Sequence, residues 1–170
     1  MKTIIVMAVH GAPPRDFPPD ELREYFILHS RLGFSTVSHS PAIESRYEEL
    51  EEKLKNWPRS MENDPFYAAS QEVAGKLSNI MGQEVLVGFN EFCAPDVHEA
   101  LRNATQRGAT RVFVVSTMLT QGGEHAEKDI SGAVQEAKKS YPEIEIIYAW
   151  PFETDDVALF MAEHIKKFFR

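Results

Sequence analysis

The feature that most constrains the fold is a set of four short apolar runs separated by longer amphipathic segments. The runs are rich in Val, Ile and Phe and show little polar alternation; they are Thr3–Val9, Glu84–Phe89, Arg111–Ser116 and 144–149. Strands that are buried on both faces of a parallel sheet have this pattern. Because helical periodicity lies between the runs, we predict an α/β fold with a parallel four-stranded sheet, helices on both faces and right-handed crossovers.

The helical segments carry recognisable start and stop signals. Asp64 and Pro65 begin one helix and Gly82 ends it, and further helices begin near Pro95, Glu124 and Thr154. Apolar side chains at helical spacing are expected to face the core. They are Phe66, Val73, Leu77 and Ile80 in the first helix, Val97, Leu101 and Ala104 in the second, Ile130, Val134 and Ala137 in the third, and Val157, Phe160, Met161, Ile165 and Phe168 in the last.

The connection between the first two runs, residues 10–83, is far longer than one crossover helix requires. It contains a proline-rich turn at 13–19 and two helical patterns, at about 20–31 and at Pro41–Lys55. We interpret residues 14–62 as a helical insertion within a single domain of residues 1–170. The insertion leaves from the end of the first strand and forms either a lid over a site or an extra packing layer.

Composition excludes several classes of protein. The net charge of −8 argues against a nucleic-acid-binding groove, which requires a basic face. No segment approaches the ~20 apolar residues that span a bilayer, so no membrane partner is expected. Cys93 is the only cysteine, which precludes an internal disulfide and suits a reducing cytoplasm.

Polar side chains follow three of the predicted strands at the same edge of the sheet. His10 comes after the first strand, Glu91 after the second and His125 after the third. Ligands bind beyond the carboxyl ends of parallel strands, so we expect these three side chains to converge. Two imidazoles and a carboxylate suit a borderline divalent ion such as Co²⁺ or Fe²⁺. Open coordination positions would remain for a metal that is handed on or that activates water.

The pair Gly122 and Gly123 precedes His125 and is a second candidate for ligand binding. Glycines let the backbone approach a ligand closely, and the following helix N-terminus favours anions such as substrate carboxylates. An ordinary glycine-rich turn is the alternative interpretation.

Three stretches resemble the small class II chelatases of cobalamin and siroheme biosynthesis, the sirohydrochlorin cobaltochelatases and ferrochelatases. They are IIVMAVHG at 4–11, GFNEFCAPDVHEAL at 88–101 and VVSTMLTQGGEHAEKDI at 114–130. The sequence departs from the family pattern at Ala12, Ser116 and Ser131, where the family often has Ser, Pro and Pro. These departures bear on the choice of metal and tetrapyrrole more than on the reaction class.

The resemblance implies a chelatase that inserts Co²⁺ or Fe²⁺ into sirohydrochlorin or a related tetrapyrrole. It implies that His10 and His125 bind the metal and face the macrocycle while Glu91 assists them. We expect the two imidazoles to face each other across an empty cleft wide enough for a planar ring. No tightly bound cofactor is expected, because the metal is a substrate. The resemblance also implies a homodimer, since longer relatives carry two such units in one chain.

Two other functions fit the same residues. A non-catalytic divalent-metal carrier would use the histidines without a cavity for a planar ring. A metal-dependent hydrolase would arrange His10, Glu91 and His125 around an activated water and would retain its metal tightly. A plain interaction module remains a third alternative, although no feature of the sequence favours it.

Overall fold

The protein is built on one parallel sheet. The structure, a computed structural model, describes residues 1–34 and 40–169. Within these ranges, strands β1 (Thr3–Val9), β2 (Glu84–Phe89), β3 (Arg111–Ser116) and β4 (Glu145–Tyr148) pair in the order β2-β1-β3-β4. Every pair is parallel, which confirms the predicted α/β fold class. Only β4 differs from its expected bounds, by one residue at each end.

The helices begin and end at the signals in the sequence. They are α1 (Pro19–Phe34), α2 (Pro41–Lys55), α3 (Pro65–Met81), α4 (Val97–Gln106), α5 (Ser131–Ser140) and α6 (Thr154–Lys166), and a π-helical turn, η1 (His125–Ile130), continues directly into α5. The Asp64 side chain accepts the Tyr67 N–H at the start of α3, and Gly82 ends that helix in the left-handed conformation. Asp96 and Glu99 form a capping box at the start of α4.

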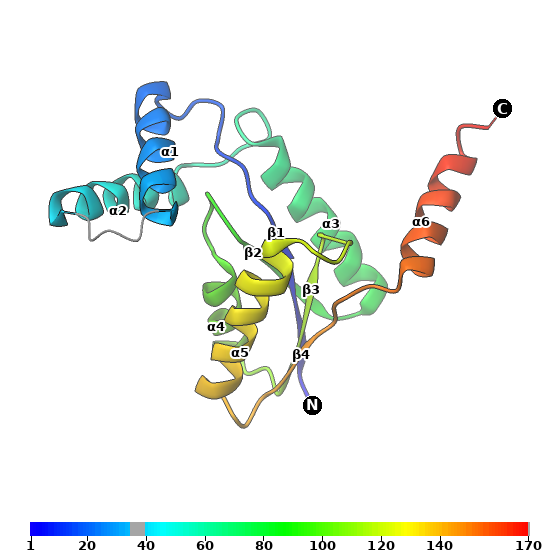
Figure 1. The fold of residues 1–170 in the computed structure, drawn as a ribbon. Coiled ribbons are helices and arrows are strands. Elements are labelled where there is room, and N and C mark those ends of the chain that lie inside the picture. Colours follow the sequence, from blue (N-terminus) through cyan, green and yellow to red (C-terminus); the bar gives the residue numbers. More distant parts are fainter. Residues whose placement is uncertain (35–39, 170) are drawn as a thin grey trace.

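Helices α4 and α5 cover one face of the sheet (Figure 1). Side chains of β1, β3 and β4 meet those of the two helices in the largest apolar cluster, which includes Ile4, Val6, Val112, Val114, Leu101 and Val134. All six residues predicted to face the core from these helices are buried: Val97, Leu101, Ala104, Ile130, Val134 and Ala137. Those predictions are confirmed.

Helix α3 lies on the opposite face, over β1 and β2 (Figure 1), and there the predicted inward side chains are wrong. Ser70 and Ala74 are its buried residues, whereas Phe66, Val73 and Ile80 are between 39% and 81% exposed and the fourth predicted residue, Leu77, is only partly buried. The helix therefore packs on the sheet through small side chains and through Tyr67, which stacks on Phe89. Hydrophobic periodicity identified the more apolar face of α3, but in this chain that face points away from the sheet.

Helix α6 stands away from the sheet (Figure 1), so its predicted burial is also wrong. All thirteen residues of α6 belong to the described part of the chain, and none of them is buried. Phe160, Met161 and Ile165, together with Phe168 just beyond the helix, are between 49% and 73% exposed. Its periodicity correctly indicates an apolar face, but nothing among residues 1–34 and 40–169 covers that face.

Helices α1 and α2 form a small core of their own at the carboxyl edge of the sheet, where Phe17, Tyr25, Leu28, Leu50 and Leu54 pack together. Phe92, from the loop after β2, packs against this cluster and joins the insertion to the sheet. Residues 35–39, including His39, lie outside the described residues. No helix in the described ranges combines the length and apolar character that crossing a membrane requires.

Candidate metal centre

His10, Glu91 and His125 come together at the carboxyl edge of the sheet. They follow β1, β2 and β3, and His125 is the first residue of η1. The His10 Nε2 lies 3.7 Å from one Glu91 carboxylate oxygen, and the His125 Nε2 lies 3.9 Å from the other. Within the described residues, these three form the one group of three or more His, Cys, Asp or Glu side chains whose ligand atoms all lie within 4.8 Å of one another. The convergence expected from the strand ends is thus present.

The backbone holds His10 and Glu91 in register. The Asn90 N–H donates to the Val9 carbonyl and the Glu91 N–H to the His10 carbonyl, each at 2.8 Å, which extends the pairing of β1 and β2 beyond the strands. Gly11 has φ +104°, and a Cβ at this position would lie 2.0 Å from the Glu91 carbonyl oxygen. Only glycine allows the two loops to approach so closely.

Hydrogen bonds orient both imidazoles toward Glu91. The His10 Nδ1 lies 2.9 Å from the Gly11 carbonyl oxygen, which can only accept, so Nδ1 carries the proton. The His125 Nδ1 lies 2.7 Å from the Asp129 carboxylate, and this short contact to an anion assigns it a proton as well. Each Nε2 therefore presents its lone pair on the side of the Glu91 carboxylate. Two nitrogen donors and a carboxylate oxygen can hold a divalent ion there.

Asp129 supports His125 directly and Asn90 does so through Asp129, and neither residue was predicted from the sequence to have this role. The Asn90 side-chain nitrogen donates to the Asp129 carboxylate at 3.3 Å; it also lies 2.8 Å from the His125 Nδ1, but because that nitrogen carries the proton, Asn90 orients the carboxylate and not the ring. Metal-binding histidines commonly donate their second ring nitrogen to a carboxylate. The sequence signal that could have identified Asp129 is its spacing, because a residue four positions after His125 lies on the same face of the helix.

The two imidazoles touch each other, so the expectation of a ring-sized space between them is wrong. Their centroids are 4.9 Å apart and the ring planes cross at 83°. The reason lies in the sheet order: β1 and β3 are direct neighbours, and neighbouring strands lie only about 4.8 Å apart. Side chains that leave adjacent strand ends meet without room for a planar ligand. The pair is open to solvent on one side, where the His10 and His125 side chains remain 43% and 31% exposed.

A cleft of about 360 Å³ lies beside Glu91. Asn90, Phe92 and Asp129 line it from the metal centre, and the insertion contributes Tyr25, His29, Glu51 and Lys55. The insertion thus forms one wall of the cleft. Burial raises the pKa of Tyr25, and also that of Tyr47 behind it, so both phenols are neutral at physiological pH.

Gly122 and Gly123 lie in an exposed loop before η1. No heavy atom in the described part of the chain lies within 4 Å of a Cβ built at either position, so the loop leaves open space around them. The Gly122 N–H already donates to the Glu127 carboxylate at 2.7 Å. One backbone donor of this turn is therefore occupied by the chain itself, and a ligand-binding role for the two glycines stays a prediction.

Comparison with known proteins decides the family. The CbiX family model matches residues 60–167, well over half of the chain. The chain belongs to the CbiX family. The match bears out the resemblance to the small class II chelatases, and it includes Glu91, His125 and Asp129. It does not reach His10, whose place in the metal centre therefore depends on the geometry alone.

Two relatives come from Priestia megaterium. This CbiX-family chain is 31% identical to a sirohydrochlorin ferrochelatase over 70 residues, or 41% of this chain and 26% of the relative. It is 34% identical to a sirohydrochlorin cobaltochelatase over 71 residues, or 42% of this chain and 23% of the relative. The chain thus spans about a quarter of the length of these curated relatives. A crystal structure of a CbiX protein from Marinobacter aquaeolei VT8 shares the fold, with a TM-score of 0.51 and 14% identity over 97% of this chain and 95% of that one.

Proposed function

We propose that this CbiX-family protein is a chelatase that inserts Co²⁺ or Fe²⁺ into sirohydrochlorin or a related tetrapyrrole. The observation that carries the proposal is the pair of imidazoles, His10 and His125, whose Nε2 atoms both face the Glu91 carboxylate. Such a site offers the metal two neutral imidazole nitrogens and one carboxylate oxygen. Coordination positions on the metal therefore stay open for the nitrogens of the acceptor ring. The names of the two Priestia megaterium relatives support sirohydrochlorin as the ring.

In the proposed reaction, one divalent ion replaces two pyrrole protons. His10 and His125 hold the metal through Nε2, and the macrocycle approaches the exposed side of the pair. As the pyrrole nitrogens displace the protein ligands, the freed imidazoles and the Glu91 carboxylate accept the two protons. Asp129 stabilises a protonated His125, because its carboxylate lies 2.7 Å from Nδ1. The metal is a substrate in this scheme, so it binds weakly and no cofactor is retained.

Aromatic side chains supply a surface for the flat ring beside the metal. The Phe92 ring lies 6.1 Å from the His10 ring, and Tyr25 and Phe26 of α1 lie 6.2 and 6.0 Å from Phe92. Phe92 lines the cleft, and its ring can make stacked or edge-on contacts with a flat aromatic ligand while Tyr25 and Phe26 pack against it. The proposal therefore gives the insertion a part in substrate binding, as a wall rather than as a distant packing layer.

The direct test is an anaerobic insertion assay that follows the visible absorbance of sirohydrochlorin. Co²⁺, Fe²⁺ and Ni²⁺ are supplied in turn, with enzyme-free controls for spontaneous insertion. We expect faster insertion of Co²⁺ or Fe²⁺ with the wild type, a loss of at least a hundredfold in His125→Ala, and no loss in the control His164→Ala, on α6. Insertion at the spontaneous rate with every metal would overturn the proposal.

The same preparation separates the two other functions. A metal carrier binds Co²⁺ but leaves the absorption band of added sirohydrochlorin unshifted. A hydrolase retains stoichiometric metal after dialysis and cleaves ester or phosphoester substrates with that metal bound. The chelatase proposal predicts a shifted band and metal that dialyses away.

We further propose that the protein forms a homodimer through α6. Phe160 and Ile165 are exposed apolar side chains of this helix. Phe160 also lines a cavity of about 620 Å³ between α3 and α6, together with Val73, Leu77, Val115, Phe152 and Val157. A helix of thirteen residues is marginal in water unless its apolar face is covered. Helix α6 is acidic in its first turn, at Asp155 and Asp156, and basic in its last. Antiparallel pairing with α6 of a second copy places opposite charges together, as a two-fold contact requires.

Sedimentation equilibrium tests the dimer. We expect the wild type to sediment as a dimer and Phe160→Glu, which places a charge in the apolar face, to sediment as a monomer. Gln135→Glu makes the same charge change on the exposed side of α5 and is expected to remain dimeric. A monomeric wild type at micromolar concentration would contradict the proposed contact.

A further inference from the structure

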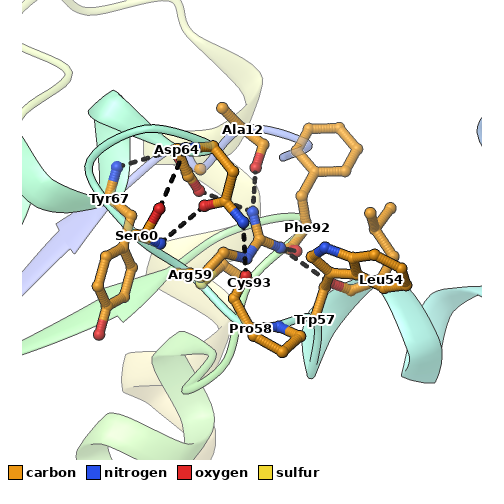
Figure 2. Close-up of polar contacts among 12 residues, drawn as sticks. Ala12, Leu54, Trp57, Pro58, Arg59, Ser60, Asp64, Tyr67, Phe92 and Cys93 are labelled. Atoms are coloured by element: carbon orange, nitrogen blue, oxygen red, sulfur yellow. Dashed lines mark hydrogen bonds and ion pairs between the residues drawn. The ribbon is translucent and has the colours of Figure 1, made fainter. Parts of the chain in front are cut away.

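Arg59 lies at the end of the insertion and is almost completely buried, with 4% of its side chain exposed. Its guanidinium donates to three carbonyl oxygens and one carboxylate (Figure 2). One terminal nitrogen donates to the Ala12 carbonyl and to the Asp64 carboxylate, each at 2.7 Å. The other donates to the Leu54 carbonyl at 2.8 Å and to the Phe92 carbonyl. A single side chain therefore joins the end of α2 and the start of α3, each five residues away, to the loops of Ala12 and Phe92, which are distant in the sequence.

Two of these segments carry metal-centre residues. Ala12 lies two residues after His10, and Phe92 follows Glu91 directly. Phe92 also has φ +63°, a conformation that L residues rarely adopt and that persists only where surrounding contacts impose it. Arg59 provides such a contact at the Phe92 carbonyl. The other two segments are the end of α2, at Leu54, and the start of α3, where Asp64 caps the helix.

We propose that Arg59 is the positioning residue of the metal centre. By donating to both the Ala12 and the Phe92 carbonyls, its guanidinium fixes the loop of His10 against the loop of Glu91. The insertion then positions the loops of His10 and Glu91 as well as lining the cleft, because it supplies the Arg59 side chain. The expected effect of Arg59 on metal affinity rests on the proposed function, whereas the expected effect on the order of the two loops does not.

A purely structural role is the alternative explanation. Buried ion pairs such as Arg59 with Asp64 are by themselves weak evidence for stability, because desolvation opposes the attraction. A positive charge alone does not explain the hydrogen bonds of Arg59, because only the planar guanidinium of arginine can donate to several acceptors at once. The Arg59 Nε has no hydrogen-bond partner among the described residues, so the remaining atoms of the fork carry all of these contacts.

Hydrogen exchange distinguishes the two roles without any metal. The amides of Asn90 and Glu91 donate to Val9 and His10, so their protection reports how firmly the two loops are held. In Arg59→Met, we expect both amides to exchange at least tenfold faster relative to the amide of Val6, inside β1. Arg46→Met removes a partly exposed arginine of the same insertion, paired with Glu24 and Glu49, and is expected to leave this ratio unchanged. Equal acceleration of Asn90, Glu91 and Val6 in Arg59→Met would show general destabilisation and overturn the inference.

A Co²⁺ titration provides the second readout. We expect wild type and Arg46→Met to bind alike, and Arg59→Met to bind at least tenfold more weakly at a temperature where it remains folded. Arg59→Lys keeps the charge beside Asp64 but lacks the fork, so it is expected to fold and to bind several-fold more weakly; it decides the question if Arg59→Met does not fold. Full affinity in folded Arg59 variants would refute the positioning role. Absence of Co²⁺ binding in the wild type would instead count against the proposed function, and the exchange experiment would still test Arg59.

Discussion

Replacing Gly11 with alanine perturbs the closest backbone approach in the metal centre. Alanine at φ +104° costs on the order of 1–3 kcal/mol in conformational strain. Its Cβ would also lie 2.0 Å from the Glu91 carbonyl oxygen, so the two loops must separate. With this rearrangement included, we expect a loss of about 3 kcal/mol in the free energy of unfolding. For a chain of this size, that loss lowers the melting temperature by about 6–12 °C.

The assay is thermal unfolding followed by circular dichroism, with a Co²⁺ titration of the folded protein. Gly75→Ala is the matched control, because this glycine lies in α3 with no heavy atom of the described chain within 4 Å of its Cβ position. The control should melt at the wild-type temperature or slightly above it, since alanine favours the helix. Gly11→Ala should also bind Co²⁺ more weakly, as Glu91 moves away from His10. A Gly11→Ala variant with unchanged melting and affinity would refute the described packing of the two loops.

Three further predictions concern single side chains. Asp129→Ala removes the acceptor of the His125 Nδ1 proton, and we expect Co²⁺ affinity to fall by about 10–100-fold in a titration while Asp155→Ala on α6 leaves it unchanged. Asp96→Ala removes the capping box of α4 and should lower stability by about 1 kcal/mol in a denaturant titration; an unchanged midpoint would contradict the cap. Burial raises the pKa of the Cys93 thiol to about 11, so iodoacetamide at pH 8 should modify the native protein far more slowly than the unfolded protein. The pKa of this thiol is higher in the folded protein than in the unfolded protein, so the contribution of Cys93 to stability is present below about pH 9 and is lost as the pH rises toward 11. Chemical denaturation of the wild type and of Cys93→Ala across that pH range measures this contribution.

Local signals determined how well the elements could be predicted. The apolar runs located β1, β2 and β3 without error, and the Asp64, Pro65 and Gly82 signals gave the bounds of α3. These features depend on residues near one another in the chain. The exposure of α6 could not be predicted in the same way, because an amphipathic pattern shows that a helix has an apolar face without showing what covers that face.

The candidate metal centre was only partly accessible from the sequence. Strand ends placed His10, Glu91 and His125 at one edge, because parallel strands share the direction of their carboxyl ends. The contact between the imidazoles depends on the sheet order β2-β1-β3-β4, which the three motifs do not specify. The role of Arg59 depends on tertiary contacts among four segments, and no local sequence pattern identifies such a residue.

In the proposed reaction, His10 and His125 together hold the metal that is inserted. X-ray absorption at the cobalt edge tests it most directly, on the wild type and the His10→Ala/His125→Ala double variant at millimolar Co²⁺. We expect about two imidazole ligands on cobalt in the wild type, at a bonding distance of about 2.1 Å, and none in the double variant. A wild-type spectrum with oxygen ligands alone, or one that the double variant reproduces, would contradict it.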